Sequence, residues 1–200
     1  MSALDAGAER IARLPGDRRI LIGIAGAPGA GKSTFAAALA ARVDGTVLPM
    51  DGFHLPQARL VELGRRDRMG APDTFDVDAF VEVLGSLRTG EPVSAPAFDR
   101  TVEQPRPGAI LIQPGDRIVL IEGNYLLHDA DGWQRVAPLL DATIFVHLDH
   151  VIRHDRLIAR HIAFGKTPDA AREWALGTDE RNAALITAGS HRADLVLELD

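Results

Sequence analysis

The sequence predicts an α/β protein built as a three-layer sandwich, in which helices cover both faces of a parallel sheet. Short apolar runs alternate with helical segments along the 200 residues, and this alternation is typical of parallel strands joined by helical crossovers. The runs are continuously apolar, as expected for strands buried on both faces. Five strands are expected, at residues 19–26, 45–51, 116–123, 142–149 and 193–200.

Helical periodicity indicates the elements between these strands. The expected helices are residues 4–14, 32–43, 76–90, 150–165 and 167–186. In a sheet of this kind ligands bind at the carboxyl ends of the strands. Two segments, at about 52–75 and 94–116, are rich in Gly, Pro and Arg and fit neither pattern. We expect them to wrap the mouth of the site as loops or a small hairpin.

Length and composition limit the classes of function. Two hundred residues make one domain, or one domain with a small lid. The net charge of −6 gives no general attraction to nucleic acid or to an anionic membrane, so any site for a polyanion is local. The absence of cysteine excludes thiolate metal sites. No apolar run reaches the length of a membrane span, and the first 19 residues lack the apolar centre of a signal peptide. A cytoplasmic protein is expected.

The stretch "GAPGAGKST" follows the first strand and opens the first long helix. It matches G-x-x-x-x-G-K-[ST] at every fixed position, the pattern of a loop that cradles phosphates. Lys32 is expected to reach the β- and γ-phosphates, and the Ser33 hydroxyl to ligate Mg²⁺. The predicted nucleotide-binding residues are Gly26, Ala27, Pro28, Gly29, Ala30, Gly31, Lys32, Ser33 and Thr34. A function that depends on ATP or GTP follows.

Three classes of protein share this loop, and the rest of the sequence favours a small-molecule kinase. The guanine-reading N-K-x-D of GTPases is absent, because the two lysines are Lys32 and Lys166. The strand "IVLIEG" ends in the single acid Glu122, where transporter and motor ATPases normally carry adjacent acids. A kinase instead needs a carboxylate near the γ-phosphate to accept the proton of a substrate hydroxyl.

Asp51 and Glu122 end two of the predicted strands and are the candidate carboxylates. Asp51, in "PMDGFH", faces the nucleotide across the crevice and is interpreted as the general base, with Gly52 leaving room for a substrate. The alternative is a turn-forming Asp-Gly pair. Glu122 is expected to hold Mg²⁺ directly or through water, and its alternative is a solvent-exposed charge at a strand end.

Arg156 and Arg160 lie four residues apart in the helix at 150–165. Side chains at this spacing project from one face of a helix. Two guanidiniums placed in this way are able to fold over the transferring phosphate, and they give the hypothesis of catalytic lid arginines. The alternative is a solvated helix face.

Taken together, these residues resemble the phosphoribulokinase/uridine kinase/pantothenate kinase group, and most closely the compact bacterial nucleoside/nucleotide-kinase-like or fructose-transport-system kinase-like proteins. The resemblance rests on the ordered segments "GAPGAGKST", "MDGFH", "MGAPDTFD", "PAFDR", "IEGNYLL", "RLIARH" and "RADLVLELD". It implies the phosphate-loop NTPase type of fold over residues 1–200, with strand order 2-3-1-4-5 and a small helical lid at 153–170. It also implies ATP as donor and Mg²⁺ as metal.

The resemblance also assigns roles by position. It places the base at Asp51, the Mg²⁺-associated acid at Glu122 and the lid arginines at Arg156 and Arg160. The residues that it places near the acceptor are Asp51, His54, Asp99, Arg100, Glu122 and Tyr125. It places the loop with His191 and Arg192 against adenine. Relatives are often dimers, so a homodimer is an expectation of the resemblance. The longer acceptor-binding segments of pantothenate and uridine kinases have no match here, so the acceptor is not inherited.

Three weaker patterns leave alternatives open. Arg65, Arg66 and Arg68 form either a solvated loop or a clamp for an anionic acceptor. The histidines at 147, 150 and 154 cluster at a strand–helix junction without the spacing of a zinc site. Trp133 and Trp174 fit helix packing better than base stacking, and no interleaving of basic and aromatic residues indicates nucleic-acid binding.

The predicted function is an ATP- and Mg²⁺-dependent kinase that phosphorylates a hydroxyl of a small polar metabolite. A sugar or a nucleoside-like polyol is the favoured acceptor, and pantothenate-like acids come next. The alternative is a regulatory protein that binds or hydrolyses ATP without a small-molecule acceptor.

Overall fold

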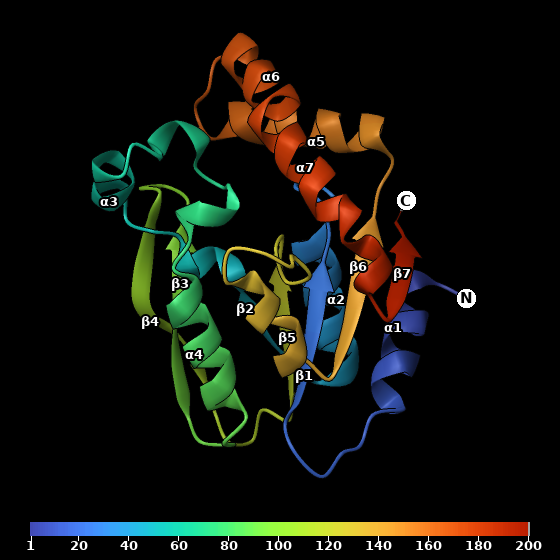
Figure 1. Ribbon diagram of the computed structural model, residues 1–200. Helices are drawn as coiled ribbons and strands as arrows, with labels where there is room; N and C mark the ends of the chain where they lie inside the picture. Colours follow the sequence, from blue (N-terminus) through green and yellow to red (C-terminus); the bar gives the residue numbers. More distant parts are fainter. Residues whose placement is uncertain (200) are drawn as a thin grey trace.

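A computed structural model describes residues 1–199 of the chain. Its centre is a five-stranded parallel sheet in the order β2-β5-β1-β6-β7 (Figure 1). Counted along the chain, these five strands have the order 2-3-1-4-5, so the expected topology is confirmed. Asp200, the last residue of the strand expected at 193–200, lies outside the described residues. The strands are β1 (Ile20–Ala25), β2 (Thr46–Pro49), β5 (Ile118–Gly123), β6 (Ala142–His147) and β7 (Leu195–Glu198).

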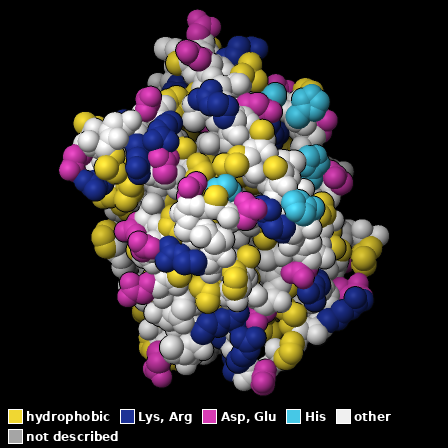
Figure 2. Space-filling model, in the orientation of Figure 1, with side chains coloured by type: hydrophobic (Ala, Val, Ile, Leu, Met, Phe, Trp, Pro, Cys, Tyr) yellow, Lys and Arg dark blue, Asp and Glu magenta, His cyan; other side chains and the backbone are white. Residues whose placement is uncertain are grey.

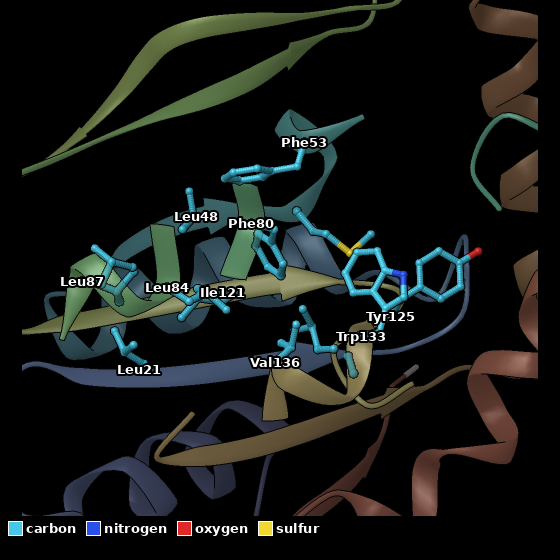
Figure 3. Packing of buried hydrophobic residues seen from close by; sticks show 14 of the residues in the cluster. Leu21, Leu48, Phe53, Phe80, Leu84, Leu87, Ile121, Tyr125, Trp133 and Val136 are labelled. Carbon is cyan, nitrogen blue, oxygen red and sulfur yellow. The ribbon is translucent and has the colours of Figure 1, made fainter. Parts of the chain in front are cut away.

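Helices cover both faces of the sheet, as predicted. The helices α1 (Ala3–Ala12) and α2 (Lys32–Val43) pack Ile11, Phe35 and Leu39 against one face. On the other face, α4 (Val77–Leu87) packs Phe80 and Leu84, and α7 (Thr178–Ala188) contributes Ile186. Figure 3 shows the aromatic part of this second cluster, in which the Trp133 ring lies between Phe80 and Tyr125. The sandwich therefore has two cores, one on each side of the sheet.

The segment 153–170, expected as a small lid, spans parts of the first two of three helices that we call the lid helices; the first two lie above the carboxyl edge of the sheet, and the third runs down from there along the sheet (Figure 1). They are α5 (His150–Ala163), α6 (Pro168–Leu176) and α7. The prediction of a single helix at 167–186 is wrong. The helical conformation is interrupted at Gly177, which has φ −101° and ψ −88°. This break lets α6 and α7 take different directions over the same cavity.

The two Gly- and Pro-rich segments fold beside the sheet. Residues 93–112 form an antiparallel hairpin of β3 (Val93–Asp99) and β4 (Gln104–Ile112), which confirms the expectation of a small hairpin. The segment 52–75 contains the short helix α3 (Gln57–Glu62) and the 3₁₀ turns η2 (Arg66–Arg68) and η3 (Pro72–Thr74). A further turn, η1 (Met50–Phe53), joins this segment to β2.

Arg19 fastens the hairpin and α4 to the start of β1. Its side chain is 4% exposed and bonds to backbone carbonyls rather than to a carboxylate. The acceptors, at 2.7–3.2 Å, are the carbonyls of Leu87, Gly90, Glu91, Gln113 and Asp116. A planar guanidinium with five donors fits such a set, so one buried residue fixes the ends of three elements.

Replacing Arg19 by Ala should destabilise the fold by roughly 3 kcal/mol or more, because several buried carbonyls lose their donor at once. The measurement is urea unfolding followed by circular dichroism. Arg117→Ala is the matched control, since the exposed Arg117 guanidinium bonds to the carbonyl of Gly16 and its loss should cost under about 1 kcal/mol. Equal losses in the two variants would contradict the role given to Arg19.

No helix formed by residues 1–199 is long and apolar enough to cross a membrane. On the face shown in Figure 2, basic and acidic side chains are interspersed.

Candidate active site

The phosphate loop joins the end of β1 to the first turn of α2. Gly29 and Gly31 have φ of +80° and +88°, a backbone conformation that glycine adopts without strain. The loop curls around Lys32, whose Nζ donates to the carbonyl of Ala27 at 3.0 Å. Backbone N–H groups at a helix start make a ready anion site. The loop therefore has the conformation that its sequence predicts.

The Lys32 ammonium is buried beneath this loop, and burial lowers its pKa to about 8, although Glu122 and Asp51 oppose the shift. The free protein should therefore bind ATP more weakly as pH rises above about 8, because binding then requires Lys32 to take up a proton. Titration calorimetry between pH 7.5 and 9.5 measures the effect. Lys32→Ala should bind weakly at every pH and show no such step, and a flat wild-type profile over this range would contradict the assignment.

Ser33 and Glu122 meet beside the loop. The parallel register brings Gly123 of β5 opposite Ala25 of β1, so Glu122 lies next to the start of α2. The Ser33 hydroxyl donates to Glu122 Oε1 at 3.0 Å. Burial raises the pKa of Glu122, although the Lys32 ammonium opposes the shift. A buried carboxylate beside a hydroxyl is an all-oxygen donor set of the kind that Mg²⁺ prefers, so these residues fit a magnesium ion.

Asp51 lies on η1, directly after β2, and shares the cavity with Lys32 and Ser33. Its Oδ2 accepts from Arg100 Nη2 at 2.5 Å. Among the described residues, this is the only side-chain hydrogen bond of the carboxylate, so Oδ1 is left for a ligand. Burial alone would raise the pKa of Asp51, but the positive charges of His54, which is protonated in acid, and of Arg100, Lys32 and Arg160 outweigh it and lower the pKa. Asp51 is therefore ionised at neutral pH.

The His54 ring lies between Phe75 and Phe98, with centroids 4.0 and 4.7 Å away. Its Nδ1 lies 2.8 Å from the carbonyl oxygen of Asp51. Because a carbonyl only accepts, this nitrogen carries the proton. Burial lowers the pKa of His54, so the neutral ring presents Nε2 as an acceptor. The prediction that His54 stands by the acceptor cavity agrees with this position.

The sequence led us to expect that Gly52 leaves room for a substrate. In the structure the backbone of Pro96 occupies this space instead. A Cβ at this position would lie 2.2 Å from the carbonyl oxygen of Pro96. The missing side chain lets the hairpin approach η1, and this approach brings Arg100, just past β3, to Asp51. Gly52 thus serves the assembly of the site through backbone packing.

Arg156 and Arg160 project from the same side of α5 but reach different parts of the site. Arg160 lines the cavity that holds Asp51 and Lys32. Arg156 lines a neighbouring pocket with Gly31 and Thr34, and its Nη1 lies 3.6 Å from where a Cβ of Gly31 would stand. The two guanidiniums therefore lie on either side of the phosphate loop.

Two residues expected at the acceptor site have other places. Asp99 is absent from the cavity wall, and its Oδ1 accepts from the backbone N–H of Thr101 at 2.9 Å, within the hairpin turn. Tyr125 is fully buried in the core, where its hydroxyl donates to the carbonyl of Gly70 at 2.5 Å. Figure 3 shows this hydroxyl pointing away from the apolar cluster. Tyr125 thus supports Gly70, which lines the cavity.

His191 and Arg192 lie in a turn before β7 begins, at the end of that strand away from the phosphate loop. Arg192 donates to the carbonyl of Leu127 and to Asp129, both at 2.9 Å. The structure does not bring these two residues to the nucleotide loop. The pocket next to Thr34 is lined instead by Leu199, beyond the end of β7, and by Phe35. The segment before the last strand, which was expected to contact adenine, lies at the amino end of β7, whereas this pocket lies at the carboxyl end.

The arginines of the segment 52–75 are held by local partners. Arg65 and Arg68 pair with Asp73, at 3.2 and 2.7 Å. Arg66 pairs with Glu103 at 2.5 Å, and both line the cavity. Of the two alternatives left open by the sequence, a clamp of all three arginines is not formed, because Arg65 and Arg68 pair within the loop itself.

The histidines of the β6–α5 junction include His150 and His154, whose ring centroids lie 6.1 Å apart. His154 lies 2.8 Å from Glu180, and the described residues contain no group of three or more acids and histidines arranged to hold a metal ion. Histidine side chains gather on the face beside α5 in Figure 2.

The lid helices bring further residues to the cavity that sequence reasoning missed or left undecided. They are His161, Lys166, Trp174, Asp179 and Asn182. Trp174 was interpreted as a packing residue, and the structure places it on the cavity wall instead. His161 ends the segment "RLIARH", but no short motif contains the other four, which come from α6, α7 and a connection. For Lys166, the signal in the sequence was its position shortly after the lid arginines.

A phosphate loop between a strand and a helix, a buried lysine under it, and a hydroxyl–carboxylate pair beside it define a phosphate-loop protein that handles a nucleoside triphosphate. Residues 21–199 match the phosphoribulokinase/uridine kinase family. The chain belongs to this family and is an ATP-dependent phosphotransferase that acts on a hydroxyl group of a small metabolite.

Individual relatives support this placement. The ATP-dependent kinase-like protein notR' of Aspergillus versicolor is 37% identical over 145 residues, which cover 67% of this chain and 84% of the relative. The uridine kinase of Halalkalibacterium halodurans is 31% identical over 151 residues, covering 74% of this chain and 69% of the relative. A solved structure from Silicibacter sp. TM1040, named "putative fructose transport system kinase", is 37% identical with a TM-score of 0.90, and the match covers 98% of this chain and 100% of that one.

Proposed function

We propose that the protein transfers the γ-phosphoryl group of ATP to a hydroxyl of a small, neutral, hydroxylated metabolite, with a sugar or nucleoside-like polyol as the favoured class. The observation that carries the proposal is the place of Asp51. Its ionised carboxylate shares one cavity with the Lys32 ammonium and with the Ser33–Glu122 pair. A kinase needs this combination of a proton acceptor and phosphate-binding groups.

The donor is bound by the phosphate loop. Lys32 and the loop N–H groups hold the β- and γ-phosphates, and the pocket beside Thr34, Phe35 and Leu199 takes the base. Arg156 lines that pocket, and Arg160 faces the acceptor cavity. The two arginines lie on either side of the loop, where they stabilise the negative charge that spreads over the transferring group.

Ser33 and Glu122 are the residues that hold Mg²⁺, Glu122 directly or through water. The ion supplies neutralisation of the phosphate charge when it is bound. The raised pKa of Glu122 follows from burial of a carboxylate beside a single lysine, and this is an environment that accepts a further cation.

Asp51 takes the proton of the acceptor hydroxyl. As the hydroxyl oxygen bonds to the γ-phosphorus, the bond from that phosphorus to the β,γ-bridging oxygen breaks and ADP leaves. Arg100 fixes one carboxylate oxygen of Asp51, so the other is the atom that receives the proton. His54 and the aromatic rings around it hold η1 in place.

The charge of the cavity favours a neutral acceptor over an acid of the pantothenate type. Its wall carries five basic side chains, Lys32, Arg66, Arg100, Arg160 and Lys166, and four acidic ones, Asp51, Glu103, Glu122 and Asp179. The polyphosphate of ATP adds negative charge to this nearly balanced set. A second anion inside the same low-dielectric space is therefore unfavourable.

A panel of acceptors tests the proposal. Sugars, nucleosides, pantothenate and other vitamins are incubated with protein, ATP and Mg²⁺, and ADP release is followed. At least one neutral polyol should raise ADP release at least tenfold above the background without acceptor. Release that no compound raises would favour the other candidate, a protein that binds or hydrolyses ATP without a small acceptor.

A further inference from the structure

Lys166 and Trp174 stand where the acceptor cavity meets a second pocket. Both residues line the cavity that contains Asp51. Both also line an outer pocket, whose other walls are Asp67, Ala170, Glu173, Gly177, Thr178 and Arg181. The two side chains therefore form a partition between the inner cavity and the outer pocket.

The partition lies across the cavity from the reacting end. Asp51 is on η1, at the edge of the sheet that β2 forms, whereas Trp174 is on α6, at the top of the molecule in Figure 1. An acceptor whose hydroxyl approaches Asp51 therefore directs its other end toward α6. We call Lys166 and Trp174 the end wall of the acceptor cavity.

Trp174 holds the ammonium of Lys166 in place. Lys166 Nζ lies 4.4 Å from the centroid of the Trp174 ring, which is a cation–π contact. Arg66 and Arg100, which also line the cavity, each pair with a carboxylate. No ion pair between Lys166 and a carboxylate occurs within residues 1–199. The ammonium keeps its donors for a ligand.

Fixed hydrogen-bonding groups surround the end wall. Asp179 is 8% exposed, and its Oδ2 lies 2.7 Å from His161 Nε2. Asn182 donates to the carbonyl of Gly70 at 3.2 Å. These hydrogen bonds link α5, α7 and the loop around Gly70, and they fix the positions of the elements next to the end wall.

From this arrangement we infer that Lys166 and Trp174 determine acceptor specificity. Lys166 donates a hydrogen bond to an oxygen of the acceptor at the end away from the reacting hydroxyl. Trp174 is the positioning residue for that ammonium, and its ring limits the length of acceptor that fits. This inference rests on the proposed kinase function and names which part of the site selects the substrate.

The experiment compares a monosaccharide with a nucleoside. Steady-state kcat and KM are measured for the monosaccharide with the highest turnover in the panel and for uridine, together with KM for ATP. The variants are Trp174→Ala, Trp174→Phe and Lys166→Met. Leu176→Ala is the matched control, because Leu176 is exposed on the same helix and lines neither pocket.

Trp174→Ala opens the inner cavity to the outer pocket, so kcat/KM for uridine relative to the monosaccharide should rise about tenfold. Lys166→Met should raise KM for the monosaccharide about tenfold and change kcat less than threefold. Trp174→Phe keeps a ring for the ammonium and should stay within about threefold of wild type. KM for ATP should change less than threefold in all of them.

Two negative results have different meanings. If the wild type phosphorylates an acceptor but Trp174→Ala and Lys166→Met leave the ratio and the monosaccharide KM as in Leu176→Ala, the inference is overturned and the kinase function stands. If the wild type phosphorylates no compound of the panel, the proposed function fails and the inference fails with it. Thermal unfolding of each variant shows that a change in KM does not arise from loss of fold, and Lys166→Met decides the question if Trp174→Ala does not fold.

Discussion

Asp51→Asn should lower kcat by about 10²-fold or more while ATP binds almost as tightly as to the wild type. A positioned base contributes about 10²–10⁴-fold to proton transfer, and an amide cannot accept the proton that the carboxylate takes. The phosphate loop does not depend on Asp51 for its shape, because Lys32 bonds to the loop carbonyl of Ala27. Turnover with the best acceptor and ATP affinity by calorimetry give the two halves of the prediction.

Asp99→Asn is the matched control for this variant. Asp99 is close in sequence to Arg100, but its carboxylate accepts a backbone hydrogen bond in the hairpin turn. An amide oxygen accepts the same bond, so kcat should stay within about threefold of wild type. Equal losses in Asp51→Asn and Asp99→Asn would remove Asp51 from the mechanism.

Lys32→Ala should weaken ATP binding and lower turnover together, by about 10²-fold or more in kcat/KM. The buried ammonium is the compact positive charge within the phosphate loop, and such a charge stabilises both the bound triphosphate and the transferring group. Lys32→Arg should recover little of this, because a planar guanidinium does not fit where the ammonium reaches the Ala27 carbonyl. Full activity in the arginine variant would show that charge alone, without the compact shape, suffices.

The sequence allowed the fold and the donor side of the site to be predicted because both depend on local patterns. Continuous apolar runs marked the five parallel strands, and the glycine spacing marked the loop around Lys32. Asp51 and Glu122 were found because each ends a strand, and Pro49 pairs with Glu122 across β2 and β5. The carboxyl ends of neighbouring parallel strands necessarily meet at one edge.

The acceptor side could not be predicted in the same way, since it is assembled from distant segments. Arg100 reaches Asp51 only because the hairpin packs closely over Gly52. Trp174 and Asp179 reach the cavity because the chain breaks at Gly177, a break that helical periodicity on either side conceals. Tyr125 and Asp99 were expected at the acceptor site, but their polar groups are used in other hydrogen bonds. The Tyr125 hydroxyl bonds to a carbonyl in the core, and the Asp99 carboxylate accepts a bond within the hairpin turn.

The same contrast separates the parts of the chain that form the two sides of the site. In the proposed mechanism the phosphate loop and the two carboxylates carry out the phosphoryl transfer, and they lie at the carboxyl ends of the sheet strands. The hairpin, the segment 52–75 and the lid helices supply the wall of the cavity, and the short segments that they share with the family do not name the acceptor. We therefore expect the identity of the acceptor to depend on residues such as Lys166 and Trp174, which only the three-dimensional arrangement places together.

The most direct test of the central claim is the fate of the γ-phosphate. Phosphorus NMR of a completed reaction with the best acceptor of the panel shows where it goes. We expect a new phosphomonoester resonance on the acceptor that grows in equal amount with ADP and is lost in Asp51→Asn. A reaction in which the γ-phosphate appears only as inorganic phosphate, with every acceptor unchanged, would contradict the kinase function.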